Sequence, residues 1–219
     1  MPRAPKRRAT GVGRLIVSDD CVAEGAAWLA VREPRFAGAL AVTGPLPLRL
    51  RPEGFAALLN AIMAQQVSVA SAEAIWQKLL AAGLTGEEAV AKADEDALRQ
   101  CGLSRQKIRY AKALAHARID YAALGGLPDA DVLGILTRVP GIGAWTAEIY
   151  AMFSLGRADV FAPGDLALQE AARLLFGLDA RPRERELRAM AEAWSPWRSV
   201  AARILWAYYR VAKDREGIR

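Results

Sequence analysis

The stretch Arg138–Tyr150, RVPGIGAWTAEIY, contains a glycine-rich turn between two predicted helices. The first is predicted over residues 129–136 and the second over about residues 144–155. Glycine reaches backbone angles that other residues avoid, and the free amides at the start of a helix attract anions. The stretch therefore predicts an anion-binding turn, although a plain tight turn between packed helices would use the same glycines. The position of the bulky Trp145 in the first turn of the second helix needs a separate explanation.

The composition of the chain predicts an all-α protein. Of its 219 residues, 53% are hydrophobic, which is enough for a sizeable core. Many of these are alanines, which favour helices. The most strand-like run is PLPLRLRP, residues 45–52, and it is short and interrupted by proline.

Candidate N-caps divide the chain into short amphipathic helices. A capping residue accepts a hydrogen bond from a free amide of the first helical turn. The candidates are Asp19 or Asp20, Ser68, Thr85 with Glu88 as a capping box, Asp94, Ser104 and Asp165. A final long helix is predicted over about residues 199–212.

The cysteines and the hydropathy exclude several classes of protein. Cys21 and Cys101 are too few for a disulfide framework or a four-cysteine metal cluster, and they suit a reducing cytoplasm. No run of about 18 apolar residues predicts a membrane span. The basic start of the chain lacks the apolar stretch of a secretory signal.

Positive charge is concentrated in two segments. Residues 1–14 carry five basic side chains and no acid, and residues 1–18 are predicted to form a disordered tail. Residues 99–118 carry six more basic side chains and no acid. On the helix after Ser104, Arg105, Arg109 and Lys112 share one face, which predicts contact with a polyanion such as DNA. A solvated helix face would show the same pattern.

Four blocks of sequence, in order, resemble the helix-hairpin-helix DNA glycosylases, and more narrowly the alkylated-base branch, the 3-methyladenine DNA glycosylase II (AlkA-like) group. The blocks are AIMAQQVSVASAEAIWQKL, GLSRQKIRYAKALA, VPGIGAWTAEIYAMFSLGRADVFAPGDLAL and WSPWRSVAARILWAYY. The resemblance covers nearly everything after about residue 20. It implies an all-α, two-lobed fold with the active-site cleft between the lobes.

The resemblance also implies where the lobes lie in the sequence. A central lobe is expected over residues 53–156 and ends in the hairpin. Residues 19–52 and 157–219 are expected to pair into the second lobe. Because only about 50 residues precede the first matched block, a compact version without the additional N-terminal domain of longer members is expected.

In this family the hairpin glycines, here Gly141 and Gly143, bring the backbone against a DNA phosphate without reading the base sequence. Relatives that also cut the DNA strand place a lysine where Trp145 stands. That amine forms a Schiff base with the sugar. The resemblance therefore implies base excision without strand cleavage, with Trp145 and Trp206 as aromatic walls that stack on a flipped, positively charged purine. Core packing is the alternative role for both tryptophans.

Asp165 is the expected catalytic residue. It would stabilise the positive charge that develops on the sugar as the glycosidic bond breaks, and it would orient the attacking water. Its position after Pro163 and Gly164 also suits a helix cap, and both roles are compatible. A cationic base leaves without protonation, so no acid partner is needed.

Further expectations come from the family position of individual residues. Gln66 stands where relatives insert a wedge into the DNA, some with leucine, although the pair Gln65 and Gln66 also suits a helix end. No organic cofactor and no catalytic metal are expected. The family hairpin binds a monovalent cation, Na⁺ or K⁺, through backbone carbonyls, which by position are those of Thr137, Val139 and Ile142. The absence of a C-terminal four-cysteine cluster excludes the iron–sulfur branch.

The expected protein is thus a monomeric glycosylase that removes alkylated purines from double-stranded DNA in a bacterial cytoplasm, associated with the nucleoid through DNA and not with a membrane. One alternative is a non-catalytic helix-hairpin-helix DNA-binding module, which would need no carboxylate at Asp165. The other is a glycosylase for deaminated or oxidised purines, since pocket shape decides the lesion.

Overall fold

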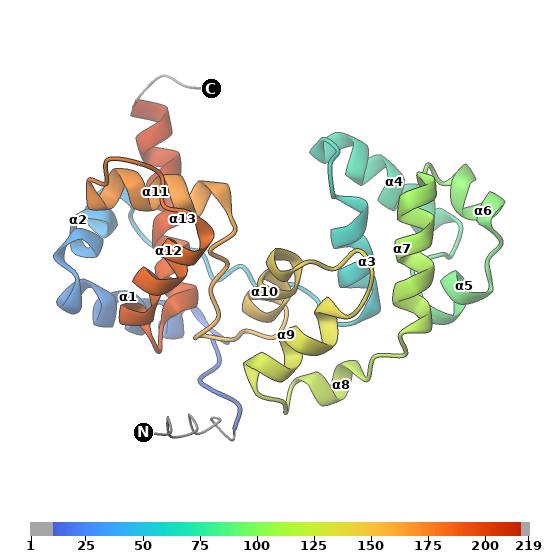
Figure 1. Ribbon diagram of the computed structural model, residues 1–219, viewed down its shortest axis with the longest axis horizontal. Coiled ribbons are helices and arrows are strands. Elements are labelled where there is room, and N and C mark those ends of the chain that lie inside the picture. Colours follow the sequence, from blue (N-terminus) through green and yellow to red (C-terminus); the bar gives the residue numbers. More distant parts are fainter. Residues whose placement is uncertain (1–10, 216–219) are drawn as a thin grey trace, which may run out of the picture.

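The computed structural model describes residues 11–215, and this part of the chain is helical and contains no β-strand (Figure 1). The α-helices are α1 (Asp19–Arg32), α2 (Pro34–Thr43), α3 (Phe55–Met63), α4 (Val69–Ala81), α5 (Glu87–Lys92), α6 (Glu95–Gln100), α7 (Arg105–His116), α8 (Tyr121–Leu124), α9 (Asp129–Thr137), α10 (Ala144–Phe153), α11 (Leu166–Phe176), α12 (Glu184–Met190) and α13 (Arg198–Arg215), with a 3₁₀ turn over Ala191–Trp194. The all-α prediction is confirmed. Within the described residues, no helix has the length and apolar character to cross a bilayer.

Four predicted N-caps form in the structure. The side chains of Ser68, Asp94, Ser104 and Asp165 accept hydrogen bonds from amides of the first turns of α4, α6, α7 and α11. These local signals succeed because a cap satisfies amides that have no partner inside their own helix.

Two cap predictions are wrong. Ser18 is the N-cap residue of α1, and the two aspartates that follow lie in the first turn. The helix α5 begins after Gly86 without a side-chain cap, so Thr85 does not form a capping box. Glu88 pairs with Lys92 at 3.4 Å, one helical turn on, and does not turn back to the start of the helix.

The buried residues form two hydrophobic cores, and α10 belongs to both. One core runs from Phe55 to Leu155, and we call its helices α3–α9 the central lobe. The other joins residues 16–39 to residues 151–205, and we call α1, α2 and α11–α13 the second lobe. Figure 1 shows the two groups of helices on either side of α10. A two-lobed fold is therefore present, and a helix between the lobes carries the residues that follow the hairpin.

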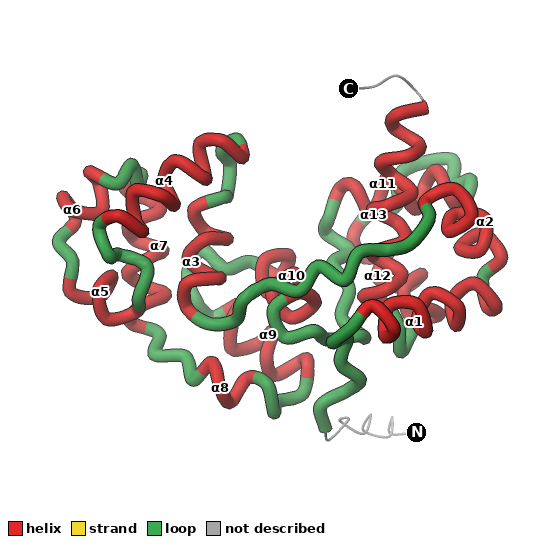
Figure 2. The backbone as a smooth tube through the Cα atoms, turned by 180° about the vertical axis from the view of Figure 1, so that it is seen from behind, coloured by secondary structure: helices red, strands yellow, loops and turns green. Residues whose placement is uncertain are grey.

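The segment between α2 and α3 is an extended linker that crosses α10 (Figure 2). The Arg51 amide donates to the Phe153 carbonyl at 2.9 Å, and the Gly54 amide donates to the Tyr150 hydroxyl at 2.8 Å. The proline-broken run that looked most strand-like in the sequence is this linker. Its hydrogen bonds go to the end of α10 and to Arg203 on α13, and not to a neighbouring strand.

The prediction of a disordered tail over residues 1–18 is wrong for its last part. The Ile16 side chain is fully buried, and its amide donates to the Gly156 carbonyl at 2.7 Å. Gly156 has a φ of +66°, and a side chain there would meet the Ile16 carbonyl oxygen at 2.8 Å. Ile16, which docks on the second lobe, lies in the short apolar run of residues 15–17 at the end of the basic segment. The basic residues before position 11 lie outside the described part of the chain.

Candidate active site

The hairpin between α9 and α10 is built around one glycine. Gly141 has a φ of +95°, and a side chain there would collide with the Tyr110 ring on α7. Gly143 has ordinary extended angles, with φ −82° and ψ 172°. As the N-cap of α10 it offers no capping side chain, which leaves the first amides of that helix open. The turn therefore requires Gly141 for its shape, while Gly143 keeps the anion-binding end of the helix uncovered.

An open groove of about 740 Å³ lies along the hairpin. Its other walls come from α7 and from the segment after α3. The Gln65 amide nitrogen donates to the Gly141 carbonyl at 2.9 Å, which ties the end of α3 to the turn. The Lys107 ammonium on the groove wall donates to the Met63 carbonyl at 2.6 Å. We call this region the hairpin groove.

Gln66 lies in the hairpin groove with a strained backbone. Its φ is +58°, an angle that costs roughly 1 kcal/mol for a residue with a side chain. The residue is exposed, as the predicted wedge would need to be. Two neighbours that the sequence analysis did not consider, Val67 and Val69, are also exposed, at 39% and 88%. The role of Gln66 as the wedge stays a prediction.

Most of the basic side chains of residues 99–118 have partners within the protein. Arg99 pairs with Asp96 at 2.8 Å, and Arg118 pairs with Glu87 at 4.0 Å. The acidic segment that precedes this stretch in the sequence thus folds back and neutralises part of it.

Lys112, which is predicted to contact DNA, has partners within the protein, and its contact with DNA stays a prediction. The Lys112 ammonium donates to the carbonyls of Ala91, at 3.1 Å, and Ala93. These carbonyls have no helical partner because α5 ends at Lys92, and Lys112 satisfies them. Arg105 and Arg109 remain exposed, and the Arg109 guanidinium lies 5.5 Å from the centre of the Tyr110 ring that covers the hairpin glycine. Their contact with DNA stays a prediction.

A second, smaller cavity of about 290 Å³ lies at the meeting point of α10, α13 and the start of α11. Asp165, Trp145 and Trp206 all line it, so the structure brings the three predicted residues together. Ile149 and Phe153 from α10 and Tyr209 from α13 complete its apolar walls. We call this cavity the base pocket.

Asp165 is held by hydrogen bonds from three directions. Its Oδ1 accepts the amides of Ala167 at 2.9 Å and Leu168 at 3.0 Å, which is the helix cap. The same oxygen accepts the Trp206 indole N–H at 3.2 Å, and Oδ2 accepts the Trp145 indole N–H at 3.0 Å. The cap and the indoles together fix the carboxylate, so the role of Asp165 as a helix cap is present and its catalytic role stays a prediction.

The two tryptophans differ in their surroundings. Trp145 is 46% exposed and lines both the base pocket and the hairpin groove, so it does not serve as core packing. Trp206 is half-buried and packs on Phe153 with ring centres 5.7 Å apart. Trp206 is thus the inner wall of the pocket, and Trp145 stands at its entrance from the groove.

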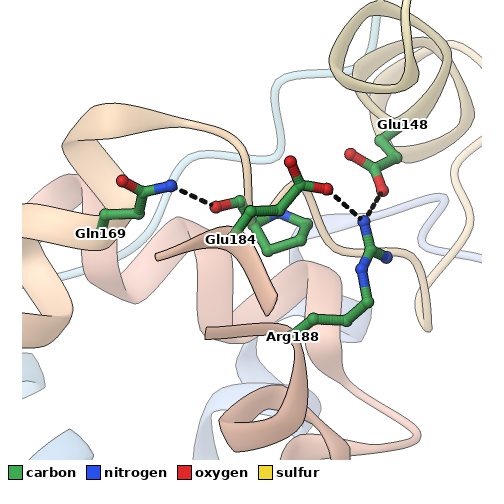
Figure 3. A network of polar contacts seen from close by, with 5 residues as sticks. Glu148, Gln169, Glu184 and Arg188 are labelled. Carbon is green, nitrogen blue, oxygen red and sulfur yellow. Dashed lines mark hydrogen bonds and ion pairs between the residues drawn. The ribbon is translucent and has the colours of Figure 1, made fainter. Parts of the chain in front are cut away.

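A polar network supports the loop that carries Asp165 (Figure 3). The Gln169 amide donates to the Pro163 carbonyl at 2.8 Å. Arg188 on α12 donates to Glu184 at 3.1 Å and to the buried Glu148 on α10 at 2.9 Å. Burial raises the pKa of Glu148, although Arg188 opposes that shift. These bonds tie α11 to the loop and α12 to α10, and the sequence analysis did not identify them.

Three arginines around the base pocket were also missed. Arg49 and Arg51 from the linker and Arg210 from α13 line the cavity. Arg210 is far from Arg49 and Arg51 in the sequence, and none of the three belongs to a long basic run, so charge density along the chain does not reveal them.

The comparisons with known proteins agree with this geometry. A family model described as "HhH-GPD superfamily base excision DNA repair protein" matches residues 59–198. DNA-3-methyladenine glycosylase 1 of Schizosaccharomyces pombe is 29% identical over 178 residues, which cover 77% of this chain and 78% of the relative.

Two solved structures share the fold. The crystal structure of a DNA-3-methyladenine glycosidase from Bacillus halodurans superposes with a TM-score of 0.79 at 31% identity, covering 87% of this chain and 91% of that one. The 3-methyladenine DNA glycosylase Mag1 of Schizosaccharomyces pombe, in complex with abasic DNA, gives a TM-score of 0.71 at 27% identity, covering 84% and 95%. The predicted family and the predicted fold are both confirmed.

Proposed function

The chain belongs to the HhH-GPD superfamily of base excision DNA repair proteins, and from that premise we propose that it excises alkylated purines, such as 3-methyladenine, from double-stranded DNA. The observation that carries the proposal is the pair of indole N–H groups directed at the Asp165 carboxylate within an aromatic pocket. The relatives named as 3-methyladenine glycosylases support the choice of substrate class.

The geometry suggests a division of labour between the two cavities. The open amides of α10 hold a phosphate of the damaged strand in the hairpin groove. The damaged nucleotide leaves the helix and places its base in the pocket, between Trp145 and Trp206. An electron-deficient alkylated purine gains cation–π attraction from these rings that an undamaged base lacks.

Asp165 acts on the sugar and not on the base. As the bond between the sugar and the base breaks, positive charge develops on the sugar, and the fixed carboxylate stabilises it. A cationic base carries away the bonding electrons and becomes neutral without an added proton. Water then completes the hydrolysis, oriented by Asp165 Oδ2, which has the fewer hydrogen-bond partners of the two oxygens.

Base removal without strand cleavage follows from the residue at the pocket entrance. Trp145 offers no amine, so no Schiff base with the sugar forms from this position. The rival reading, a non-catalytic DNA-binding module, leaves unexplained why three hydrogen-bonded side chains converge on a cavity away from the hairpin. A glycosylase for deaminated or oxidised purines shares the chemistry and differs in the base.

Two further parts of the proposal concern the surroundings of the reaction. We propose that a monomer acts on damaged duplex DNA at the bacterial nucleoid, in the cytoplasm. We also propose that Na⁺ or K⁺ binds the hairpin. In the described residues, the Thr137 and Ile142 carbonyls accept no hydrogen bond, and Val139 accepts one from the Ile142 amide. Such oxygen atoms suit a hard monovalent cation, and tighter DNA binding in K⁺ than in a bulky organic cation would support it.

The experiment is to incubate the protein with methylated duplex DNA and identify the released bases by mass spectrometry. Release of 3-methyladenine with the strand intact is the expected result. Release of hypoxanthine or oxidised purines from the matching substrates alone would move the assignment to the second alternative. Trapping of a covalent protein–DNA adduct by borohydride would contradict the hydrolytic mechanism.

A further inference from the structure

Three arginines converge at the mouth of the base pocket from two distant parts of the chain. Arg49 and Arg51 lie on the linker that crosses α10, and Arg210 lies on α13. All three residues are exposed, while Trp206 and Phe153 in the wall of the cavity are more buried. They therefore surround the rim of the cavity that contains Asp165.

These three cations lack an anionic partner. None of them forms an ion pair within the described part of the chain, although twelve such pairs occur there. Asp165 is the only acidic residue of the pocket, and its oxygens accept indole and amide N–H groups. Burial lowers the pKa of Arg49, and the nearby charges of Arg210 and Arg51 lower it further. Arg49 therefore lies near both other charges.

The backbone that presents Arg49 is held in an unfavourable conformation. Its φ is +55°, which costs roughly 1 kcal/mol for a residue with a side chain. On one side, the Leu48 carbonyl accepts a hydrogen bond at 3.0 Å from Arg203, whose side chain is 1% exposed. On the other side, the Arg51 amide donates to the Phe153 carbonyl at 2.9 Å. The linker is anchored around Arg49, so the charged cluster is built into the fold.

We propose that Arg49, Arg51 and Arg210 form a second phosphate-binding site, which holds the DNA backbone on either side of the flipped nucleotide. The inference rests on the proposed function, because it assumes that a base enters the pocket. A flipped nucleotide places its base inside the cavity and leaves its phosphates at the rim. Guanidinium groups match phosphate oxygens in geometry and charge.

The three arginines lie where they can contact a part of the DNA backbone that the hairpin does not reach. The hairpin groove lies against the central lobe, whereas Arg210 belongs to the second lobe. Two phosphate sites on opposite sides of Trp145 would hold the backbone before and after the extruded nucleotide. Bound phosphate would also neutralise the rim, which otherwise repels a cationic base.

The test compares the salt dependence of DNA binding in matched variants. The triple variant Arg49→Gln, Arg51→Gln, Arg210→Gln is compared with Arg32→Gln, Arg35→Gln, Arg181→Gln, which removes the same charge from residues that line neither cavity. The probes are a duplex with an abasic-site analogue and the same duplex undamaged. Because neither probe releases a base, the result is independent of whether the lesion was assigned correctly.

We expect the slope of log affinity against log salt for the abasic duplex to fall by about 2.7, or 0.9 for each phosphate contact. The corresponding loss of affinity near physiological salt is on the order of 10²-fold. The undamaged duplex should lose much less, and the control triple should lose little on both. Arginine-to-lysine changes at the same three positions should keep the slope, because they keep the charge.

An unchanged slope in a folded rim variant would overturn the proposal. Equal losses on the damaged and undamaged duplexes would also overturn it, because the contact would then be general. Where the triple variant fails to fold, Arg51→Gln and Arg210→Gln singly should each lower the slope on the abasic duplex by about 0.9. If wild-type protein releases no alkylated base while the slopes behave as expected, the proposed function fails and the phosphate site stands.

Discussion

The basic stretch at residues 99–118 and the arginine rim of the base pocket differ in opposite ways between sequence and fold. The first is dense in charge along the sequence and partly paired in the fold, and the second is sparse along the sequence and, within the described residues, unpaired in the fold. Residues 99–118 concentrate six basic side chains in the sequence, yet the fold gives several of them internal partners. The rim arginines come from two distant parts of the sequence, yet the fold brings them together and leaves them without an anion among the residues that the structure describes. Charge density along the chain therefore overestimates the first region and misses the second.

The difference has a structural cause. The acidic segment before α7 is close in sequence and packs beside it, so short-range pairing is available, as between Arg118 and Glu87. The rim lies where the linker and α13 meet, and Asp165 is the only acid among its residues. A cation near a surface is neutralised by whatever acid lies within a few ångströms, and spatial distance decides the strength of that interaction.

The largest expected effect is on the rate of base release, and it comes from Asp165, which belongs to neither charged surface. Asn caps a helix nearly as well as Asp, so Asp165→Asn should leave stability nearly unchanged. Because it removes the charge that faces the sugar, single-turnover release of 3-methyladenine should fall on the order of 10²–10³-fold or more. The salt slope of DNA binding should not change. A normal rate in the folded variant would make Asp165 a cap alone.

The second largest effect concerns the two tryptophans that donate hydrogen bonds to Asp165. Trp145→Phe and Trp206→Phe keep an aromatic ring and remove the N–H donor to Asp165. A hydrogen bond to a charged group contributes about 1.5–3 kcal/mol, so release should slow roughly 10- to 100-fold. The loss should be larger for Trp145, since Oδ2 has that donor alone, whereas Oδ1 keeps two backbone amides. Equal rates in both variants and the wild type would contradict this role for the indoles.

The next prediction tests the part of α7 that remains exposed. Arg105→Gln with Arg109→Gln should lower the salt slope by up to about 1.8, on damaged and undamaged duplexes alike. The equal effect on both probes is what distinguishes this general contact from the rim. An unchanged slope would show that the whole α7 face is solvated.

The smallest effect on DNA is expected from Lys112→Met, within the same stretch. Methionine keeps the length of the side chain and removes the donors to the Ala91 and Ala93 carbonyls. The free energy of unfolding in urea should fall by about 1.5–3 kcal/mol. The salt slope should match the wild type. A slope reduced by about 0.9 with full stability would restore Lys112 as a DNA contact.

Features that depend on neighbouring residues were predictable from the sequence. The caps at Ser68, Ser104 and Asp165 depend on residues two or three positions away, and they formed as predicted. The caps predicted at Asp19 or Asp20 and at Thr85 failed locally. Two other failures came where a distant contact overrode the local pattern. Ile16 docks on the second lobe although the residues before it are basic, and the proline-broken run becomes a linker because α10 lies beneath it.

The sequence by itself determined the helical class and the hairpin, and it predicted Trp145, Asp165 and Trp206 as residues of one pocket. Only the tertiary structure decided that both indoles donate to one carboxylate, that Lys112 binds carbonyls, and that Arg49, Arg51 and Arg210 share a rim. The physical reason is range. Helix caps and turns are set by atoms within a few residues of one another, whereas the partner of a charge is chosen by distance in space, which chain order does not record.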